Sequence, residues 1–162
     1  MDRTIAIGDL HGDLAALEVV MERLPALDAG DTIVFVGDYL DRGPDSRGTI
    51  AYIREQLPKV TPAQIVTLMG NHEDGWLRVI AGGWPEFVWP PGNGCMATVR
   101  SFLGTRPTED GRPQKEEFEA LFDGRFLPAD VVEWMRDLLP YYEDAHAIYV
   151  HAGLPRGPAG FL

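Results

Sequence analysis

Four short motifs rich in glycine, aspartate and histidine constrain this 162-residue chain more than any other feature. Each motif directly follows a short apolar run, and such runs bounded by Gly and Asp are typical of buried strands. The runs are Ile5–Ile7, Ile33–Val36, Ile65–Met69 and Ile148–Val150. The motifs behind them, in the same order, are Gly8-Asp9-Leu10-His11-Gly12, Gly37-Asp38-Tyr39-Leu40-Asp41-Arg42-Gly43, Gly70-Asn71-His72-Glu73 and His151-Ala152-Gly153. We therefore expect the polar side chains of the motifs at the ends of strands.

The order of the elements predicts an α/β fold. Helical patterns separate the first three strands, and a β-α-β-α-β order gives a parallel sheet with right-handed crossovers. Ligand sites of such sheets lie at the carboxyl ends of the strands, so the motifs should converge there. Carboxylate, imidazole and amide donors suit Mn, Fe or Zn better than a soft thiolate site would. A single Gly-Asp pair is also a common turn former, but four motifs in this order favour a metal site.

Apolar spacing and end signals predict the helices. The first is capped by Asp13 and stopped by Pro25, with Leu14, Leu17, Met21 and Leu24 on one stripe. The second opens at Pro44-Asp45-Ser46 and ends at Pro58. Later helices are expected over Glu73–Ala81, Gln114–Phe122 and Ala129–Leu139. Within the Gln114–Phe122 helix, the side chains expected to face inward are Phe118, Leu121 and Phe122.

The motifs resemble those of the calcineurin-like metallophosphoesterases, and within them the phosphoprotein phosphatase branch of bacterial and phage type. The signature of that branch is GDxHG, GDxxDRG, GNHE and a histidine in an H-A/G-G turn, and this sequence has each of them between Ile5 and Leu154. The resemblance implies a β-sandwich flanked by helices. It also implies a phosphomonoester hydrolase with two divalent ions, bridged by one aspartate and by a hydroxide or water.

The resemblance also implies a role for each motif residue. Asp9 and His11 would bind the first metal, and Asp38 would bridge both metals. Asn71 and His151 would bind the second metal, with Asn71 also near the substrate phosphate. Manganese is the favoured ion, with iron or zinc as alternatives.

Three further residues would act on the substrate. His72 would be the general acid that protonates the leaving alkoxide, and Asp41 would orient its imidazole. Arg42 would grip the phosphate, because its planar fork meets two oxygens at once. The alternative for Arg42 is a salt bridge to Glu73, and both can hold together.

One part of the family pattern is missing from this sequence. Relatives continue with further strands that carry a second metal-binding histidine and a second phosphate-binding arginine. We therefore expect residues 1–162 to form a single metallophosphoesterase domain that lacks its C-terminal strands.

The composition of the chain limits which binding partners and which cellular compartment we expect. A formal net charge of −11 argues against nucleic acid as a partner, since phosphate backbones need a basic surface. There is no apolar run long enough to span a membrane and no signal peptide pattern, so a cytoplasmic protein without membrane association is expected. The lone Cys95 fits a reducing compartment, and an ordinary buried or loop residue is favoured over a reactive thiol.

Three functions from different classes remain open. A protein Ser/Thr phosphatase is favoured, acting on a phosphoprotein or small phosphoester, because Asp41-Arg42-Gly43 with Glu73 matches that branch. A diadenosine tetraphosphate or other nucleotide hydrolase is the alternative, although such relatives tend to carry Asp where Glu73 stands. The third is an inactive phosphate-binding module. The aromatic segment Gly82–Gly94 is predicted to be either a substrate wall or a loop that covers the sheet edge.

Overall fold

The computed structural model of the protein describes residues 2–154, 156–157 and 160–161. Its centre is a three-stranded parallel sheet of β1 (Thr4–Ile7), β2 (Thr32–Phe35) and β3 (Gln64–Thr67), in the order β1-β2-β3. Thr4 is level with Thr32, and Thr32 with Gln64, so the three strands start together. All four residues of the central strand β2 are buried, which accounts for the apolar run from Ile33 to Phe35. The predicted α/β fold is confirmed.

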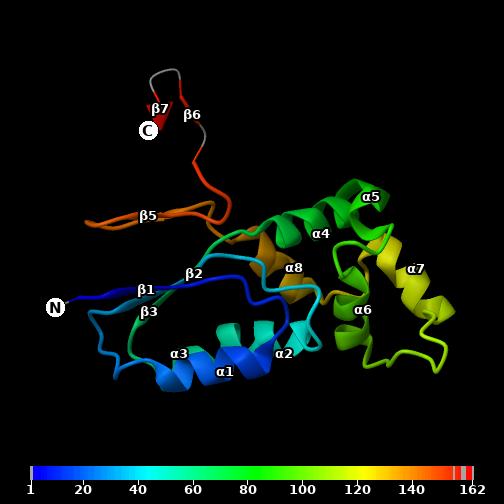
Figure 1. Ribbon diagram of the computed structural model, residues 1–162, viewed down its shortest axis with the longest axis horizontal. Coiled ribbons are helices and arrows are strands. Elements are labelled where there is room, and N and C mark those ends of the chain that lie inside the picture. Colours follow the sequence, from blue (N-terminus) through cyan, green and yellow to red (C-terminus); the bar gives the residue numbers. More distant parts are fainter. Residues whose placement is uncertain (1, 155, 158–159, 162) are drawn as a thin grey trace.

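Three helical segments cover one face of this sheet (Figure 1). They are α1 (Leu14–Arg23), α2 (Ser46–Ala51) and, beyond a π-helical turn, α3 (Leu57–Val60). Asp13 caps α1 as predicted, because its side chain accepts a hydrogen bond from the backbone N–H of Ala16 at 3.0 Å. Leu17 at the centre of the predicted stripe is fully buried.

The second helix does not end at Pro58, contrary to the sequence prediction. Helical structure continues through the π-helical turn η1 (Tyr52–Gln56) into α3 and stops at Val60. A proline in a regular helix clashes with the carbonyl four residues earlier. In the π turn the backbone N–H of Leu57 bonds to the carbonyl of Tyr52, five residues back, and this wider turn makes room for the ring.

The helix behind the third strand begins earlier than predicted. Helix α4 covers Asn71–Gly82 instead of Glu73–Ala81, so Asn71 and His72 lie in its first turn. Glu73 stabilises this start, since its carboxylate accepts the N–H of Gly70 at 3.1 Å. Gly83, with φ of 74°, ends the helix as the Gly82-Gly83 pair indicates.

A second group of helices packs beside α4 (Figure 1): α5 (Pro85–Val88), α6 (Cys95–Leu103), α7 (Lys115–Asp123) and α8 (Ala129–Arg136). Helix α6 is absent from the sequence prediction. It begins at Cys95, behind Gly94 in a left-handed conformation and without a side-chain cap, so the usual start signal is missing. Helix α8 ends three residues before the predicted Leu139. Phe118 of α7 is 40% exposed rather than inward, and its ring lies edge-on to the exposed Trp89 at 5.6 Å between centroids.

The predicted strand before His151 forms, but it does not pair with the three-stranded sheet. Strand β5 (Ile148–Tyr149) pairs antiparallel with β4 (Tyr142–Glu143), and this hairpin lies over the sheet face opposite α1 (Figure 1). Tyr142 and Tyr149 pack against Val34, Val66 and Leu68 of the main sheet. A second hairpin joins β6 (Arg156–Gly157) to β7 (Gly160–Phe161). The layered arrangement agrees with the expected sandwich flanked by helices.

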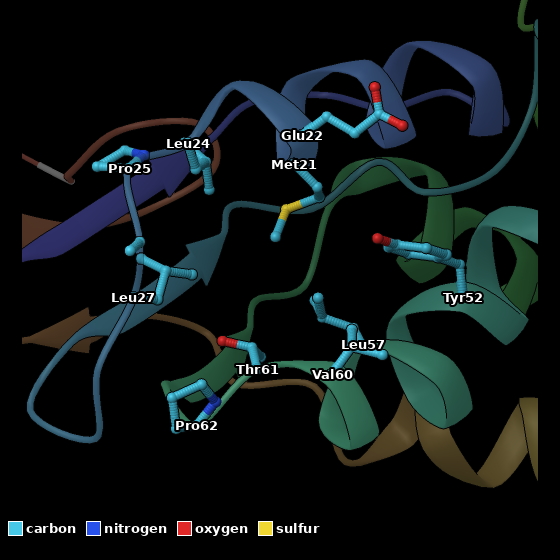
Figure 2. A pocket seen from close by; sticks show the side chains of 11 residues that line it. Met21, Glu22, Leu24, Pro25, Leu27, Tyr52, Leu57, Val60, Thr61 and Pro62 are labelled. Atoms are coloured by element: carbon cyan, nitrogen blue, oxygen red, sulfur yellow. The ribbon is translucent and has the colours of Figure 1, made fainter.

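Two surface features lie away from the strand ends. A groove with a cavity of about 350 Å³ lies between the end of α1 and α3, lined mainly by apolar side chains such as Met21 and Leu57 (Figure 2). Glu22 is its single charged residue, so it lacks the donors that phosphate chemistry needs. Within the described part of the chain, every helix is too short or too polar to cross a membrane.

Candidate metal centre and proton donor

Two loops at the carboxyl ends of β1 and β2 are joined by backbone hydrogen bonds. The N–H groups of Leu10 and His11 both donate to the carbonyl of Asp38, at 3.0 and 2.8 Å. In return the N–H of Gly43 donates to the carbonyl of His11 at 2.7 Å. The first two motifs therefore form one rigid unit, which fixes Asp9 and His11 beside Asp38.

The second loop holds several residues in a conformation that side chains disfavour. Asp38, Asp41 and Arg42 have φ values of 56°, 69° and 70°, in the left-handed region. Each such residue costs on the order of 1 kcal/mol and persists only where its surroundings enforce it. Three such residues in one short loop indicate that the surrounding structure holds these side chains in place despite the strain in the backbone.

Glu73 is the residue that enforces this loop. Its buried carboxylate accepts N–H groups from Asp38 at 2.9 Å, Tyr39 at 2.8 Å and Gly70 at 3.1 Å. Burial and the nearby charge of Asp38 raise the pKa of Glu73 to about 7, against the backbone donors that lower it. The alternative salt bridge from Arg42 to Glu73 is wrong, because Glu73 accepts backbone N–H groups while Arg42 Nη2 lies beside His72.

The close approach at Gly43 gives a test of the joined loops. A Cβ atom there would lie 2.1 Å from the carbonyl oxygen of His11, which forces the loops apart. Gly43→Ala should lower the free energy of unfolding by about 3 kcal/mol and weaken metal binding. Denaturant titration and metal titration measure the two effects. Gly82→Ala is the matched control, because a Cβ at Gly82 meets nothing within 4 Å. Equal stabilities of the two variants would contradict the account of this contact.

Asp38 lies at the centre of the candidate metal centre. One of its carboxylate oxygens is 3.6 Å from His11 Nε2, and the other is 3.4 Å from His151 Nε2. Two groups of donors result, one of His11, Asp38 and His72 and one of Asp9, Asp38 and His151, each with its ligand atoms within 4.8 Å of one another. A single carboxylate shared by two clusters is the arrangement that a bridging ligand requires.

The remaining donors surround this carboxylate. His151 Nε2 lies 2.9 Å from Asn71 Oδ1, while its Nδ1 lies 3.0 Å from the carbonyl of Val36. Asp9 is half exposed, with one oxygen 3.8 Å from His11 Nε2 and the other 3.9 Å from His151 Nδ1. The structure thus brings together all five predicted ligands, Asp9, His11, Asp38, Asn71 and His151.

His11 supplies the test of whether metal ions fit these residues. Its Nδ1 lies 2.9 Å from the carbonyl of Leu40, to which it donates, so its Nε2 carries a free lone pair. This Nε2 is buried and has no hydrogen-bond partner among the described residues. A buried imidazole lone pair that faces the oxygens of Asp9 and Asp38 is matched by a divalent cation. The donor set and this unpartnered atom therefore fit the expected metals.

The predicted proton donor pair is also formed. His72 Nδ1 is 2.7 Å from Asp41 Oδ2, and both side chains are almost fully buried. Burial lowers the pKa of His72, but the hydrogen bond and charge of Asp41 outweigh it and leave the pKa raised. The Nε2 atom of His72 lies 3.9 Å from Asp38 and accepts a hydrogen bond from Arg42 Nη2 at 3.4 Å, so this nitrogen faces the metal centre.

Other predicted residues lie as follows. Tyr39 of the second motif is a packed aromatic, since it is fully buried and its hydroxyl donates to the carbonyl of Leu68 at 2.9 Å. In the Gly82–Gly94 segment, Phe87 covers the ring of His72 at 5.7 Å between centroids, while Trp84 and Trp89 are exposed. Cys95 is buried, and burial followed by the charge of Asp41 raises its pKa, so it is not a reactive thiol.

The fold and the site define the class of this protein: an α/β protein with a carboxylate–imidazole centre of the metallophosphoesterase kind. The sequence profile of the calcineurin-like phosphoesterases matches residues 3–161. The chain belongs to that family, as its motifs predict.

Two curated relatives carry the same name. The chain is 25% identical to the symmetrical bis(5′-nucleosyl)-tetraphosphatase of Stutzerimonas stutzeri and 38% identical to that of Ralstonia nicotianae. The alignments cover 94% and 96% of this chain but only 44% of each relative. The chain therefore spans about half the length of the curated relatives it matches.

Solved structures agree on the fold. The crystal structure of a candidate diadenosine tetraphosphatase is 25% identical with a TM-score of 0.58, covering 96% of this chain and 53% of the other. A cold-active protein tyrosine phosphatase has a TM-score of 0.60 at 19% identity, covering 94% of this chain and 41% of the other. At that identity the second likeness shows the fold alone.

Proposed function

We propose that this protein is a metal-dependent phosphohydrolase that cleaves dinucleoside tetraphosphates. The observation that carries the reaction class is the single carboxylate of Asp38 facing two clusters of metal donors. The substrate class is supported by the curated relatives, which are symmetrical tetraphosphatases aligned over nearly all of this chain. The nucleotide hydrolase, which the sequence alone made the alternative, is thus the first candidate, and the Ser/Thr phosphatase is the second.

Each residue has a part in the proposed reaction. Asp9, His11, Asp38, Asn71 and His151 would hold two divalent ions, which when bound neutralise phosphoryl oxygens and acidify the attacking water. Arg42 is exposed beside His72 Nε2, so its fork can meet the phosphoryl oxygens of an incoming substrate. In its protonated form His72 can donate from Nε2 to a leaving oxygen that needs a proton, while Asp41 accepts its Nδ1–H.

A protein Ser/Thr phosphatase remains the second candidate because of one observation. The buried pair of His72 and Asp41 is a strong proton-donor arrangement. A serine alkoxide is a poor leaving group and needs a proton, whereas a nucleoside diphosphate leaves well without one. The pair of His72 and Asp41 therefore supports a phosphomonoester substrate, whereas the names of the curated relatives support a dinucleotide.

The two candidates are separated by initial rates measured on the purified full-length protein with Mn²⁺. Diadenosine tetraphosphate should be hydrolysed to two molecules of ADP, at least tenfold faster in kcat/KM than a phosphoserine peptide. Chelation of the metal should abolish the activity. A peptide preferred over the dinucleotide would establish the second candidate. No hydrolysis of either substrate at saturating metal would contradict the reaction class and leave a phosphate-binding module.

A further inference from the structure

Asp41 accepts more hydrogen bonds than the orientation of a histidine requires. Besides His72, its carboxylate accepts the indole N–H of Trp76 at 3.0 Å and the hydroxyl of Thr98 at 2.6 Å. The thiol of Cys95 lies 3.6 Å away. Asp41 itself is fully buried, so these donors replace all of the water that an exposed carboxylate would have.

Thr98 also holds the backbone of Asp41. Its oxygen accepts the N–H of Asp41 at 2.8 Å while its hydrogen goes to the carboxylate of the same residue. Thr98 therefore grips Asp41 at two points. Ser46 lies 3.0 Å from the Thr98 hydroxyl, and because Thr98 has only one hydrogen, Ser46 must donate to it.

These donors come from separate elements that converge on one residue. Asp41 lies in the loop after β2 with a left-handed φ of 69°, Trp76 lies on α4 and Thr98 on α6. Trp76 and Thr98 are both fully buried, and within the described part of the chain their side chains form no hydrogen bond with a predicted metal ligand. Their donors thus fix the carboxylate in the one rotation that places Oδ2 against His72 Nδ1.

We propose that Thr98 and Trp76 are positioning residues of the reaction, which orient the proton donor His72 through Asp41. The inference rests on the proposed function, because it assumes that His72 donates a proton. When the grip on Asp41 is lost, the imidazole is free to tilt, and Nε2 no longer faces the leaving oxygen. A displacement of about 1 Å in a reacting group costs on the order of 100-fold in rate.

Thr98→Val keeps the shape of the side chain and removes its hydrogen bonds. With the full-length Mn²⁺ protein, kcat on phenyl phosphate, a poor leaving group, should fall about 10- to 100-fold. On para-nitrophenyl phosphate, a good leaving group, the fall should stay below about threefold, since little proton transfer is needed. Thr98→Ser restores the hydroxyl and should recover most of the loss. Trp76→Phe, which removes the indole N–H, should show the same selective pattern.

Thr49→Val is the matched control, because Thr49 is also fully buried but donates to the carbonyl of Asp45. Its rates on the two esters should change equally. The imidazole N–H resonance of His72 in proton NMR, assigned by its loss in His72→Asn, gives a readout independent of turnover. Thr98→Val should shift it and Thr98→Ser should not.

An unchanged resonance together with equal losses on both esters would overturn the positioning role. A shifted resonance in a protein without hydrolytic activity would instead refute the proposed function and leave the positioning of His72 intact.

Discussion

Asp38→Asn is expected to abolish metal-dependent hydrolysis, with a loss of about 1,000-fold or more in kcat/KM. The substitution keeps the shape of the side chain but removes the negative charge shared by the two donor clusters. A neutral amide also offers a single acceptor oxygen, so it cannot supply one oxygen to the donor cluster of His11 and another to that of His151. Steady-state rates with saturating Mn²⁺ measure the loss.

Asp13→Asn is the matched control for this variant. Asp13 follows the first motif, caps α1 and is exposed, and asparagine caps a helix as well as aspartate does. Its activity should equal that of the unaltered protein. Near-normal turnover of Asp38→Asn, or an equal loss in Asp13→Asn, would contradict the assignment of Asp38 as the shared ligand.

His72→Asn is expected to slow poor leaving groups far more than good ones. Loss of a general acid costs about 100- to 10,000-fold where the leaving oxygen needs a proton, so phenyl phosphate should suffer this loss. The loss on para-nitrophenyl phosphate should stay within about tenfold. Metal content should not change, because the five predicted ligands remain.

His146→Asn controls for the removal of a histidine, since His146 is exposed and belongs to neither donor cluster. It should leave both rates unchanged. Equal losses on the two esters in His72→Asn, or a loss of bound metal, would show that His72 acts as a ligand instead, as its place 3.9 Å from Asp38 would allow.

The positions of the site residues are predictable from the sequence because each motif directly follows a strand. Parallel strands in register end at one edge, so Asp9, Asp38 and Asn71 must meet there without any knowledge of the packing. His151 is the harder case. Its strand β5 pairs with β4 rather than with the main sheet, and only the packing of that hairpin brings it to Asp38.

The supporting residues are not predictable in the same way. Glu73 looks like a partner for Arg42, but the structure turns its carboxylate onto backbone N–H groups, which carry no sequence signal. Helix α6 lacks a cap, so the sequence does not reveal that Thr98 faces Asp41, 57 residues earlier in the chain. Long-range hydrogen bonds of this kind depend on tertiary packing, which local patterns do not encode.

The central claim is that Asp38 bridges two metal ions, and electron paramagnetic resonance of the Mn²⁺-loaded full-length protein tests it most directly. With metal content measured in parallel, the account predicts two ions per chain and a spin-coupled signal. In Asp38→Asn the coupling should disappear and the metal content should fall. One uncoupled ion per chain, or coupling that survives in Asp38→Asn, would contradict the account.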